Sequence, residues 1–259
     1  MSQLGNNQPF YIVEKERGAE CPAIPTWANH TTNPAGIEES AEKGGQYQTV
    51  EGVPGAFQLL NVLNEQECAK LIELSESIGF LEDAAVSLPR SVRHNDSVTW
   101  VVDKSTNKLI WNRCAALVNQ YASENHSTQA LGLNSRFRFY RYQQADYFAP
   151  HTDGSWPGSE VINQKLITNA YDDRWSELTF LLFLSDNYEG GRTQFFVNSQ
   201  TGLPAKHGEE AQTISVRTPL GGVLCFAHGV HPLDCLHSSE AIESGAKYII
   251  RTDVLFSLS

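Results

Sequence analysis

The chain has 259 residues, of which 41% are hydrophobic and 19% charged, and its formal net charge is -11 with an isoelectric point near 5.2. This length and composition predict a globular protein with one domain of barrel or sandwich type. No apolar run approaches the roughly 20 residues that a membrane-spanning helix needs. Strong acidity disfavours binding to a phosphate backbone. We therefore expect neither a membrane protein nor a nucleic-acid-binding protein.

The start of the chain, MSQLGNNQPFYIVEKERG, lacks the basic segment followed by an apolar segment that marks a secretory signal. The chain has five cysteines, an odd number, and they do not form the pattern of a disulfide framework. Both observations favour a cytoplasmic protein with reduced thiols. Overall acidity weakly favours a cationic substrate, although net charge says little about a single pocket.

Residues 56–130 carry two helical patterns and form an expected helical support region. Asn64, followed three residues later by Glu67, resembles a capping box and predicts a helix over 65–78. Apolar residues at helical spacing predict a second helix over 106–122.

The regions on either side of these helices show no helical periodicity. Residues 1–55 are rich in Pro, Gly, Asn and Thr, so we expect an irregular N-terminal arm. Residues 131–259 hold short runs of aromatic and β-branched residues, such as SRFRFYRY and KYIIRTDVLF, separated by turn residues. Many short strands at this spacing predict a β-sandwich or jelly-roll core, which the helices would support within the same domain.

The stretch RFRFYRYQQADYFAPHTDGSWPG places His151 and Asp153 two residues apart. In an extended strand such residues point to the same face, so an imidazole and a carboxylate can meet at one point. A third ligand can come from His228, His231 or His237, which all lie in or beside expected loops. Two histidines and one carboxylate on a β scaffold form the facial triad that holds Fe(II) and leaves coordination positions open.

A cosubstrate such as 2-oxoglutarate would bring two carboxylates to this metal, and the far carboxylate would need a buried cation. Lys247 opens the last expected strand, and Arg251 lies four residues further along on the same face. On the sequence alone, either side chain can be this anchor.

The series RYQQADYFAPHTD, RWSELTFLLFLSDNYEGGRTQFF, GGVLCFAHG and LHSSEAIESGAKYIIRTDVLF resembles the catalytic half of the prolyl 4-hydroxylase-like group of Fe(II)/2-oxoglutarate-dependent dioxygenases. The resemblance implies a double-stranded β-helix. It also implies hydroxylation of an unactivated C–H bond of a small molecule or peptidyl residue. That reaction consumes O2 and converts 2-oxoglutarate to succinate by decarboxylation.

Carried over residue by residue, the resemblance implies three iron ligands, namely His151, Asp153 and His237. It further implies that Lys247 pairs with the C5 carboxylate of 2-oxoglutarate, that the Tyr142 hydroxyl donates to the same group, and that Thr179 adds a further hydroxyl. Arg251 stays the alternative anchor. Phe183 stands where the family pattern often has Tyr, which removes one hydroxyl contact.

Two loops hold candidates for substrate contact. RSVRHNDS places Arg93 and Asn95 upstream of the expected barrel, where such enzymes have substrate-facing loops. GSWPGSEVINQKLITNAYDDRW is a long insertion after the second ligand, and Trp156 in it is a candidate to face the substrate.

Other interpretations also fit the sequence. The enzyme can be a peptidyl prolyl hydroxylase in the strict sense, or the chain can be a jelly-roll metal-binding, metabolite-binding or sensor module without turnover. Zinc binding is disfavoured because the short spacing of structural zinc sites is missing from Cys225, His228, Cys235 and His237. The sequence indicates no oligomeric state.

Overall fold

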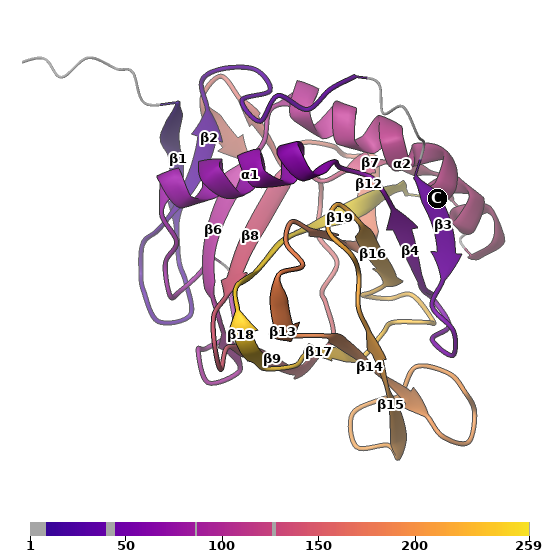
Figure 1. Cartoon of the computed structure of the whole chain (residues 1–259). Helices are drawn as coiled ribbons and strands as arrows, with labels where there is room; N and C mark the ends of the chain where they lie inside the picture. Colours follow the sequence, from indigo (N-terminus) through magenta and orange to yellow (C-terminus); the bar gives the residue numbers. More distant parts are fainter. Residues whose placement is uncertain (1–8, 40–44, 86, 126–127, 259) are drawn as a thin grey trace, which may run out of the picture.

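The computed structural model describes residues 9–39, 45–85, 87–125 and 128–258. This part of the chain is mostly β, with two long helices that lie against one side of a large sheet (Figure 1). A smaller sheet lies below the large one in the same view (Figure 1). The arrangement is consistent with the expected sandwich or jelly-roll core.

The larger sheet has ten strands, and nine of them follow one spatial order. That order is β1 (Phe10–Glu16), β2 (Ile24–Asn29), β6 (Asp96–Val101), β8 (Arg136–Tyr142), β19 (Lys247–Ser257), β12 (Arg174–Phe183), β16 (Val223–Ala227), β4 (Ala56–Leu60) and β3 (Gln46–Thr49). The tenth strand, β7 (Ala130–Leu133), also pairs with β19. Neighbouring strands are antiparallel except β2 and β6, which are parallel.

The smaller sheet has five strands, in the order β15 (Ala211–Val216), β14 (Thr193–Asn198), β17 (His237–Ser239), β9 (Tyr147–His151) and β5 (Arg93–His94). Two further antiparallel pairs complete the β structure, the hairpin of β10 (Glu160–Ile162) with β11 (Lys165–Ile167) and the long-range pair of β13 (Tyr188–Gly190) with β18 (Ile242–Gly245).

Both expected helices are observed, as α1 (Glu65–Ile78) and the longer α2 (Lys104–Asn125). Asn64 caps α1 as the sequence predicts. Its side-chain oxygen accepts the Glu67 N–H at 2.8 Å, and the Glu67 carboxylate accepts the Asn64 N–H at 3.0 Å. Neither helix in the described part of the chain is long and apolar enough to cross a membrane.

The expectation of an irregular arm over residues 1–55 is wrong for the described part of that region. It contributes β1 and β2 at one edge of the larger sheet and β3 at the other. β2 pairs on one side with the preceding strand β1 and on the other with β6, which lies about seventy residues later in the chain. Because this pairing is long-range and β2 contains Pro25, local periodicity gives little sign of the strand.

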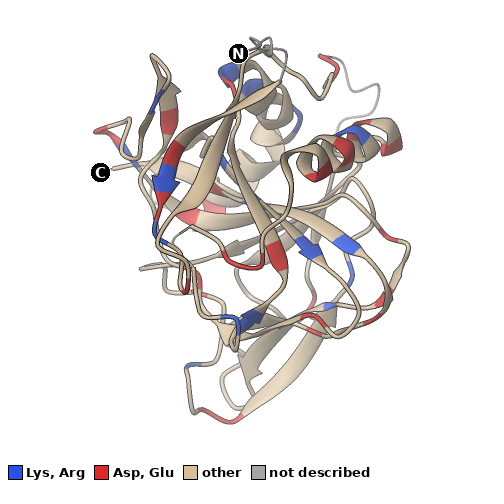
Figure 2. Cartoon of the chain, turned by 90° about the vertical axis from the view of Figure 1, so that its left-hand side faces the viewer, with Lys and Arg blue, Asp and Glu red and all other residues tan. Residues whose placement is uncertain are grey.

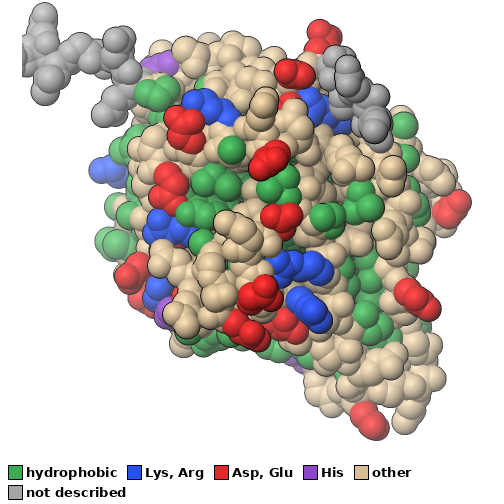
Figure 3. Space-filling model, in the orientation of Figure 1, with side chains coloured by type: hydrophobic (Ala, Val, Ile, Leu, Met, Phe, Trp, Pro, Cys, Tyr) green, Lys and Arg blue, Asp and Glu red, His purple; other side chains and the backbone are tan. Residues whose placement is uncertain are grey.

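Alternation along β8 shows how the larger sheet divides the core. Phe137 and Phe139 face the helices and belong to one apolar cluster, while Tyr140 and Tyr142 face the smaller sheet and belong to another. The functional site is built on this second face. Charged side chains are spread over helices, strands and loops (Figure 2), and on the face that carries α1 they alternate with apolar residues (Figure 3).

A buried ion pair joins the two helices. Arg113 of α2 donates to both carboxylate oxygens of Glu67 on α1, each at 2.7 Å, and both side chains are buried. The same carboxylate accepts the N–H groups of Asn64 and Glu38. Because both oxygens of the Glu67 carboxylate have hydrogen-bond donors, this ion pair is a fully satisfied polar contact between the two helices.

Replacing Glu67 with Gln should lower the free energy of unfolding by about 3 kcal/mol, because Arg113 would stay charged and buried without a carboxylate. Urea unfolding followed by circular dichroism measures the change. Glu73→Gln on the same helix is the control. It removes an exposed pair with Lys70 and should cost about 0.5 kcal/mol or less. Equal losses in the two variants would contradict a special role for the buried pair.

Candidate metal centre

The three predicted metal ligands lie together between the two sheets. His151 ends β9, Asp153 follows two residues later, and His237 opens β17 directly opposite His151. His151 Nε2 is 3.8 Å from Asp153 Oδ1, and His237 Nε2 is 3.9 Å from Asp153 Oδ2. Among the described residues, this is the one group of three or more His, Cys, Asp or Glu side chains placed to hold a metal ion.

Backbone hydrogen bonds orient both imidazole rings. His151 Nδ1 donates to the Ala149 carbonyl at 2.8 Å, and His237 Nδ1 donates to the Cys235 carbonyl at 2.9 Å. A neutral imidazole carries one N–H, so these bonds leave the Nε2 lone pair of each ring free to bind a metal. The ring of Phe148 stacks on His151, with 3.6 Å between the ring centroids, and restricts it further.

Burial sets the charge of the three ligands. It lowers the pKa of His151 to about 3 and also lowers the pKa of His237, so both rings are neutral near pH 7. Burial alone would raise the pKa of Asp153. The guanidinium of Arg251, 3.5 Å from its Oδ1, outweighs this effect of burial and lowers that pKa. The donor set is therefore two neutral imidazoles and one carboxylate.

Thr179 on β12 lies behind Asp153. Its hydroxyl donates to Asp153 Oδ2 at 2.6 Å, and it does not line the cavity beside the ligands. The Thr179 hydroxyl thus orients the Asp153 carboxylate. Its expected contact with 2-oxoglutarate stays a prediction.

His228, one of the three histidines that the sequence left open, is not among the ligands. It is fully buried, and its Nδ1 donates to the Thr179 hydroxyl at 2.8 Å while its Nε2 accepts from Ser176 at 3.0 Å. His231 lines neither cavity of the site. The geometry therefore agrees with His237 as the third ligand.

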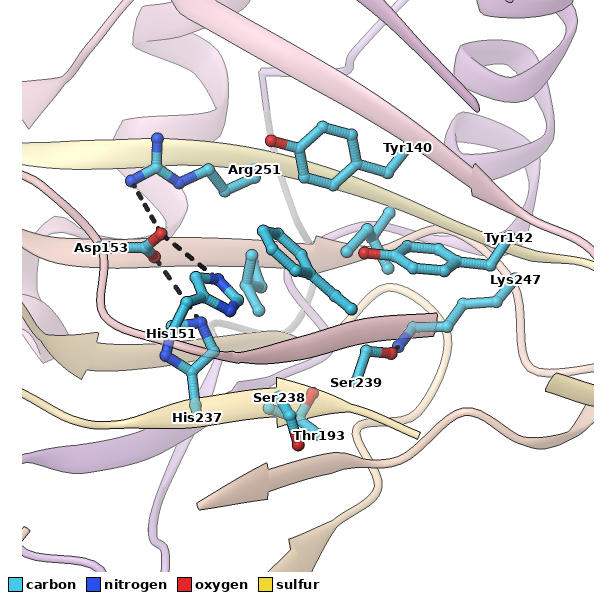
Figure 4. A pocket seen from close by; sticks show the side chains of 13 residues that line it. Tyr140, Tyr142, His151, Asp153, Thr193, His237, Ser238, Ser239, Lys247 and Arg251 are labelled. Atoms are coloured by element: carbon cyan, nitrogen blue, oxygen red, sulfur yellow. Dashed lines mark hydrogen bonds and ion pairs between the residues drawn. The ribbon is translucent and has the colours of Figure 1, made fainter. Parts of the chain in front are cut away.

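A cavity extends from the ligands between the two sheets. Figure 4 shows the two histidines and Asp153 at one end and Lys247 at the other, with the hydroxyl groups of Tyr140 and Tyr142 reaching in from β8. The remaining lining residues are Phe148, Leu181, Thr193, Ser238, Ser239, Ile249 and Arg251. Tyr142, for which the resemblance implies a contact with 2-oxoglutarate, thus lines this cavity.

Lys247 is the most unusual charge in this cavity. Only 1% of it is exposed, and its Nζ donates to the Gly191 carbonyl at 2.7 Å and to the Ser239 hydroxyl at 2.9 Å. No carboxylate of a described residue lies within 4.0 Å of it. Burial, together with the positive charge of Arg217, lowers its pKa to about 7. An ammonium group in this position is suited to bind a carboxylate supplied by a ligand.

Arg251 is placed differently, because two carboxylates of the chain already neutralise it. Its Nη2 lies 3.0 Å from Asp253 Oδ1 and 3.5 Å from Asp153 Oδ1. It is therefore at the metal end of the cavity, whereas Lys247 is at the far end (Figure 4).

Sequence reasoning missed four polar residues of the cavity, namely Tyr140, Thr193, Ser238 and Ser239. Tyr140 lies two residues before Tyr142, and Ser239 lies two residues after His237, so strand alternation could have identified both. Thr193 had a weaker signal, its place in the segment GGRTQFF just after a pair of glycines.

A second, larger cavity of about 460 Å³ shares Tyr140, Phe148, His151, Asp153 and Arg251 with the first. Two of the predicted substrate residues, Arg93 and Trp156, line it. Asn95 does not line it. Its buried side chain instead accepts a hydrogen bond from Arg93 Nη1 at 3.2 Å. The other lining residues are Arg17, Gly18, Ser87, Leu88, Arg138, Thr152 and Gly154, so the N-terminal region forms part of the wall.

No family model matches the sequence, and no curated protein matches it. Two solved structures are similar with a TM-score of 0.48. A viral collagen prolyl hydroxylase from Paramecium bursaria Chlorella virus-1, in a 2-oxoglutarate complex, is 14% identical over 79% of this chain and 97% of that chain. A Pseudomonas putida prolyl-4-hydroxylase is 13% identical over 77% of this chain and 91% of that chain.

A third similar structure is a prolyl hydroxylase from Trichoplax adhaerens in complex with a peptide fragment of the hypoxia inducible factor oxygen degradation domain. It is 15% identical, covers 79% of this chain and 83% of that chain, and has a TM-score of 0.50. The chain therefore has a fold that it shares with a prolyl hydroxylase.

Proposed function

We propose that the protein is an Fe(II)- and 2-oxoglutarate-dependent oxygenase with a double-stranded β-helix core, which hydroxylates an unactivated C–H bond. One observation carries the proposal. A donor set of two histidines and one carboxylate lies at one end of a cavity, and a buried lysine with no carboxylate partner lies at the other (Figure 4). A ligand that chelates a metal at one end and carries a carboxylate at the other matches both ends.

The charges of this cavity fit that ligand. Fe(II) held by His151, Asp153 and His237 would carry one net positive charge, and a protonated Lys247 adds a second. The two carboxylates of 2-oxoglutarate would balance them, which removes the cost of a buried, unpaired ammonium group. When bound, the iron with 2-oxoglutarate and O2 supplies the oxidising chemistry, with decarboxylation to succinate.

The residues of the chain bind and orient the reactants. Lys247 and the hydroxyl groups of Ser239 and Tyr142 would hold the far carboxylate. Arg251 and Thr179 keep Asp153 ionised and fixed in direction. The apolar side chains of Phe148, Leu181 and Ile249 line the same cavity and exclude water from it.

A cytoplasmic location is part of the proposal. All five cysteines are free, and four of them are buried, as expected for a protein kept in a reducing compartment.

The first test is the visible spectrum of the protein with Fe(II) and 2-oxoglutarate under anaerobic conditions. We expect a weak charge-transfer band that His151→Ala and His237→Ala abolish, because each variant removes a ligand. His231→Ala is the matched control and should keep the band. Absence of the band in the unmodified protein, with zinc as the bound metal, would contradict the proposed cofactors. A band without any consumption of 2-oxoglutarate across a panel of acceptors would favour a sensor.

The second test concerns the far carboxylate. Lys247→Met should raise the dissociation constant of 2-oxoglutarate about 100-fold, because a buried charge-assisted contact is lost. Titration of the charge-transfer band measures the constant, and metal analysis checks that iron is still bound. Lys165→Met, which changes an exposed lysine of β11, should leave the constant unchanged. Unchanged affinity in Lys247→Met would remove this lysine as the anchor.

The affinity for 2-oxoglutarate should also depend on pH. Lys247, with a pKa of about 7 in the empty cavity, loses its proton as the pH rises, whereas a bound carboxylate would raise that pKa. Binding therefore favours the protonated form, and affinity should fall on the order of tenfold between pH 7 and pH 8.5. His151 is neutral throughout this range because its pKa is about 3. The dissociation constant at each pH gives the profile, and an affinity that rises with pH would contradict this account.

A further inference from the structure

We propose that the substrate is a small organic anion, whose carboxylate or phosphate group binds the guanidinium groups of Arg93 and Arg138. The inference rests on the proposed function, since it takes the metal centre as the reacting end of the larger cavity. It concerns the charge of the substrate, which the proposed reaction itself leaves undetermined.

The larger cavity has a charge opposite to that of the whole chain. Four of its described lining residues are arginines, namely Arg17, Arg93, Arg138 and Arg251, and one is acidic, Asp153. The chain as a whole has a net charge of -11. Since Asp253 lies 3.0 Å from Arg251 and balances its charge, the other three arginines determine the charge that a substrate meets.

Arg93 lies beside the metal ligands without an ion pair. Only 3% of it is exposed, its Nη1 donates to Asn95, and its Nε is buried without a partner. No carboxylate of a described residue lies within 4.0 Å of it. β5 pairs with β9 so that Arg93 is opposite Phe148, the ring that stacks on His151. A group bound to this guanidinium is therefore one side chain away from a metal ligand.

Arg138 is a second arginine of this cavity with no carboxylate of a described residue within 4.0 Å. It lies on β8 opposite Arg251 of β19, and its guanidinium carbon is 5.2 Å from the centre of the Trp156 ring. Its Nε is also buried without a partner. Burial and the neighbouring charge of Arg251 lower its pKa to about 10, so it stays charged at neutral pH. Arg93 and Arg138 line the same cavity, and an anion bound there would stabilise both guanidinium groups.

Guanidinium groups recognise carboxylate and phosphate oxygens through planar pairs of N–H donors. The rings of Tyr140, Phe148 and Trp156 line the same cavity and suit the organic part of such a ligand. The volume of about 460 Å³ lies within the range of small-molecule sites, and Arg17 and Leu88 belong to its wall. These features favour a small acid over a long peptide.

Binding, measured without turnover, tests the inference. The probes are phenylacetate, phenyl phosphate and the neutral phenylacetamide, observed by ligand NMR on the full chain with saturating 2-oxoglutarate and no added iron. We expect at least one of the two anions to bind about tenfold more tightly than the amide. The anion that binds more tightly shows whether the site prefers a carboxylate or a phosphate group. Equal binding of both anions and the amide would overturn the proposal.

Variants locate the anion. Arg93→Gln and Arg138→Gln should each remove the roughly tenfold preference, while Arg192→Gln, which changes an exposed arginine outside the cavity, should keep it. Arg93→Lys and Arg138→Lys retain the charge and should keep part of the preference, which separates lost recognition from misfolding. Anion binding that persists in both Gln variants but disappears in Lys247→Met would place the anion in the 2-oxoglutarate cavity and overturn the proposal.

The outcome is distinguishable from failure of the proposed function, because the NMR measurement needs neither iron nor O2. An anion preference that depends on Arg93 and Arg138, in a protein without the charge-transfer band, would support the anion site and reject the oxygenase. Tighter binding of an acidic peptide than of either small anion would overturn the small-molecule assignment.

Discussion

The contact between Asp153 and Arg251 is the interaction on which the site depends. Asp153 follows β9 of the smaller sheet, and Arg251 lies on β19 of the larger sheet, so their pairing joins the two sheets at the ligands. Without the guanidinium, burial would favour a protonated Asp153, and a protonated carboxyl is a poor metal ligand. The same contact therefore closes the sandwich locally and keeps the ligand ionised.

A chain of hydrogen bonds extends this constraint from Asp153 to the larger cavity. Thr179 donates to Asp153, His228 donates to Thr179, and Ser176 donates to His228. Ser176 in turn accepts the backbone N–H of Trp156, whose ring lines the larger cavity. Each polar side chain in this series of hydrogen bonds has a partner. The direction of the Asp153 carboxylate and the position of the cavity wall at Trp156 are therefore fixed together.

Cations without a protein counterion among the described residues lie in two different cavities. Lys247 faces the cavity in which we propose that 2-oxoglutarate binds, and Arg93 and Arg138 face the larger cavity. Arg251 belongs to both, but its charge is neutralised by the carboxylates beside it. A cation without a protein counterion is costly in a buried place, so each such cation indicates where a ligand supplies the missing charge.

The sequence by itself determined the elements whose signals are local. The capping box at Asn64 predicted α1, aromatic runs predicted β8 and β19, and the spacing of His151 and Asp153 predicted an imidazole and a carboxylate close together near one strand end. Only the tertiary structure decided how these parts meet. Strand pairing placed His237 opposite His151, and ion pairing assigned Arg251 to Asp153 and left Lys247 without a carboxylate. The tertiary structure also determined that the Thr179 hydroxyl contacts Asp153 and that β1 and β2 belong to the larger sheet. Both features depend on long-range contacts, which leave no periodic pattern in the sequence.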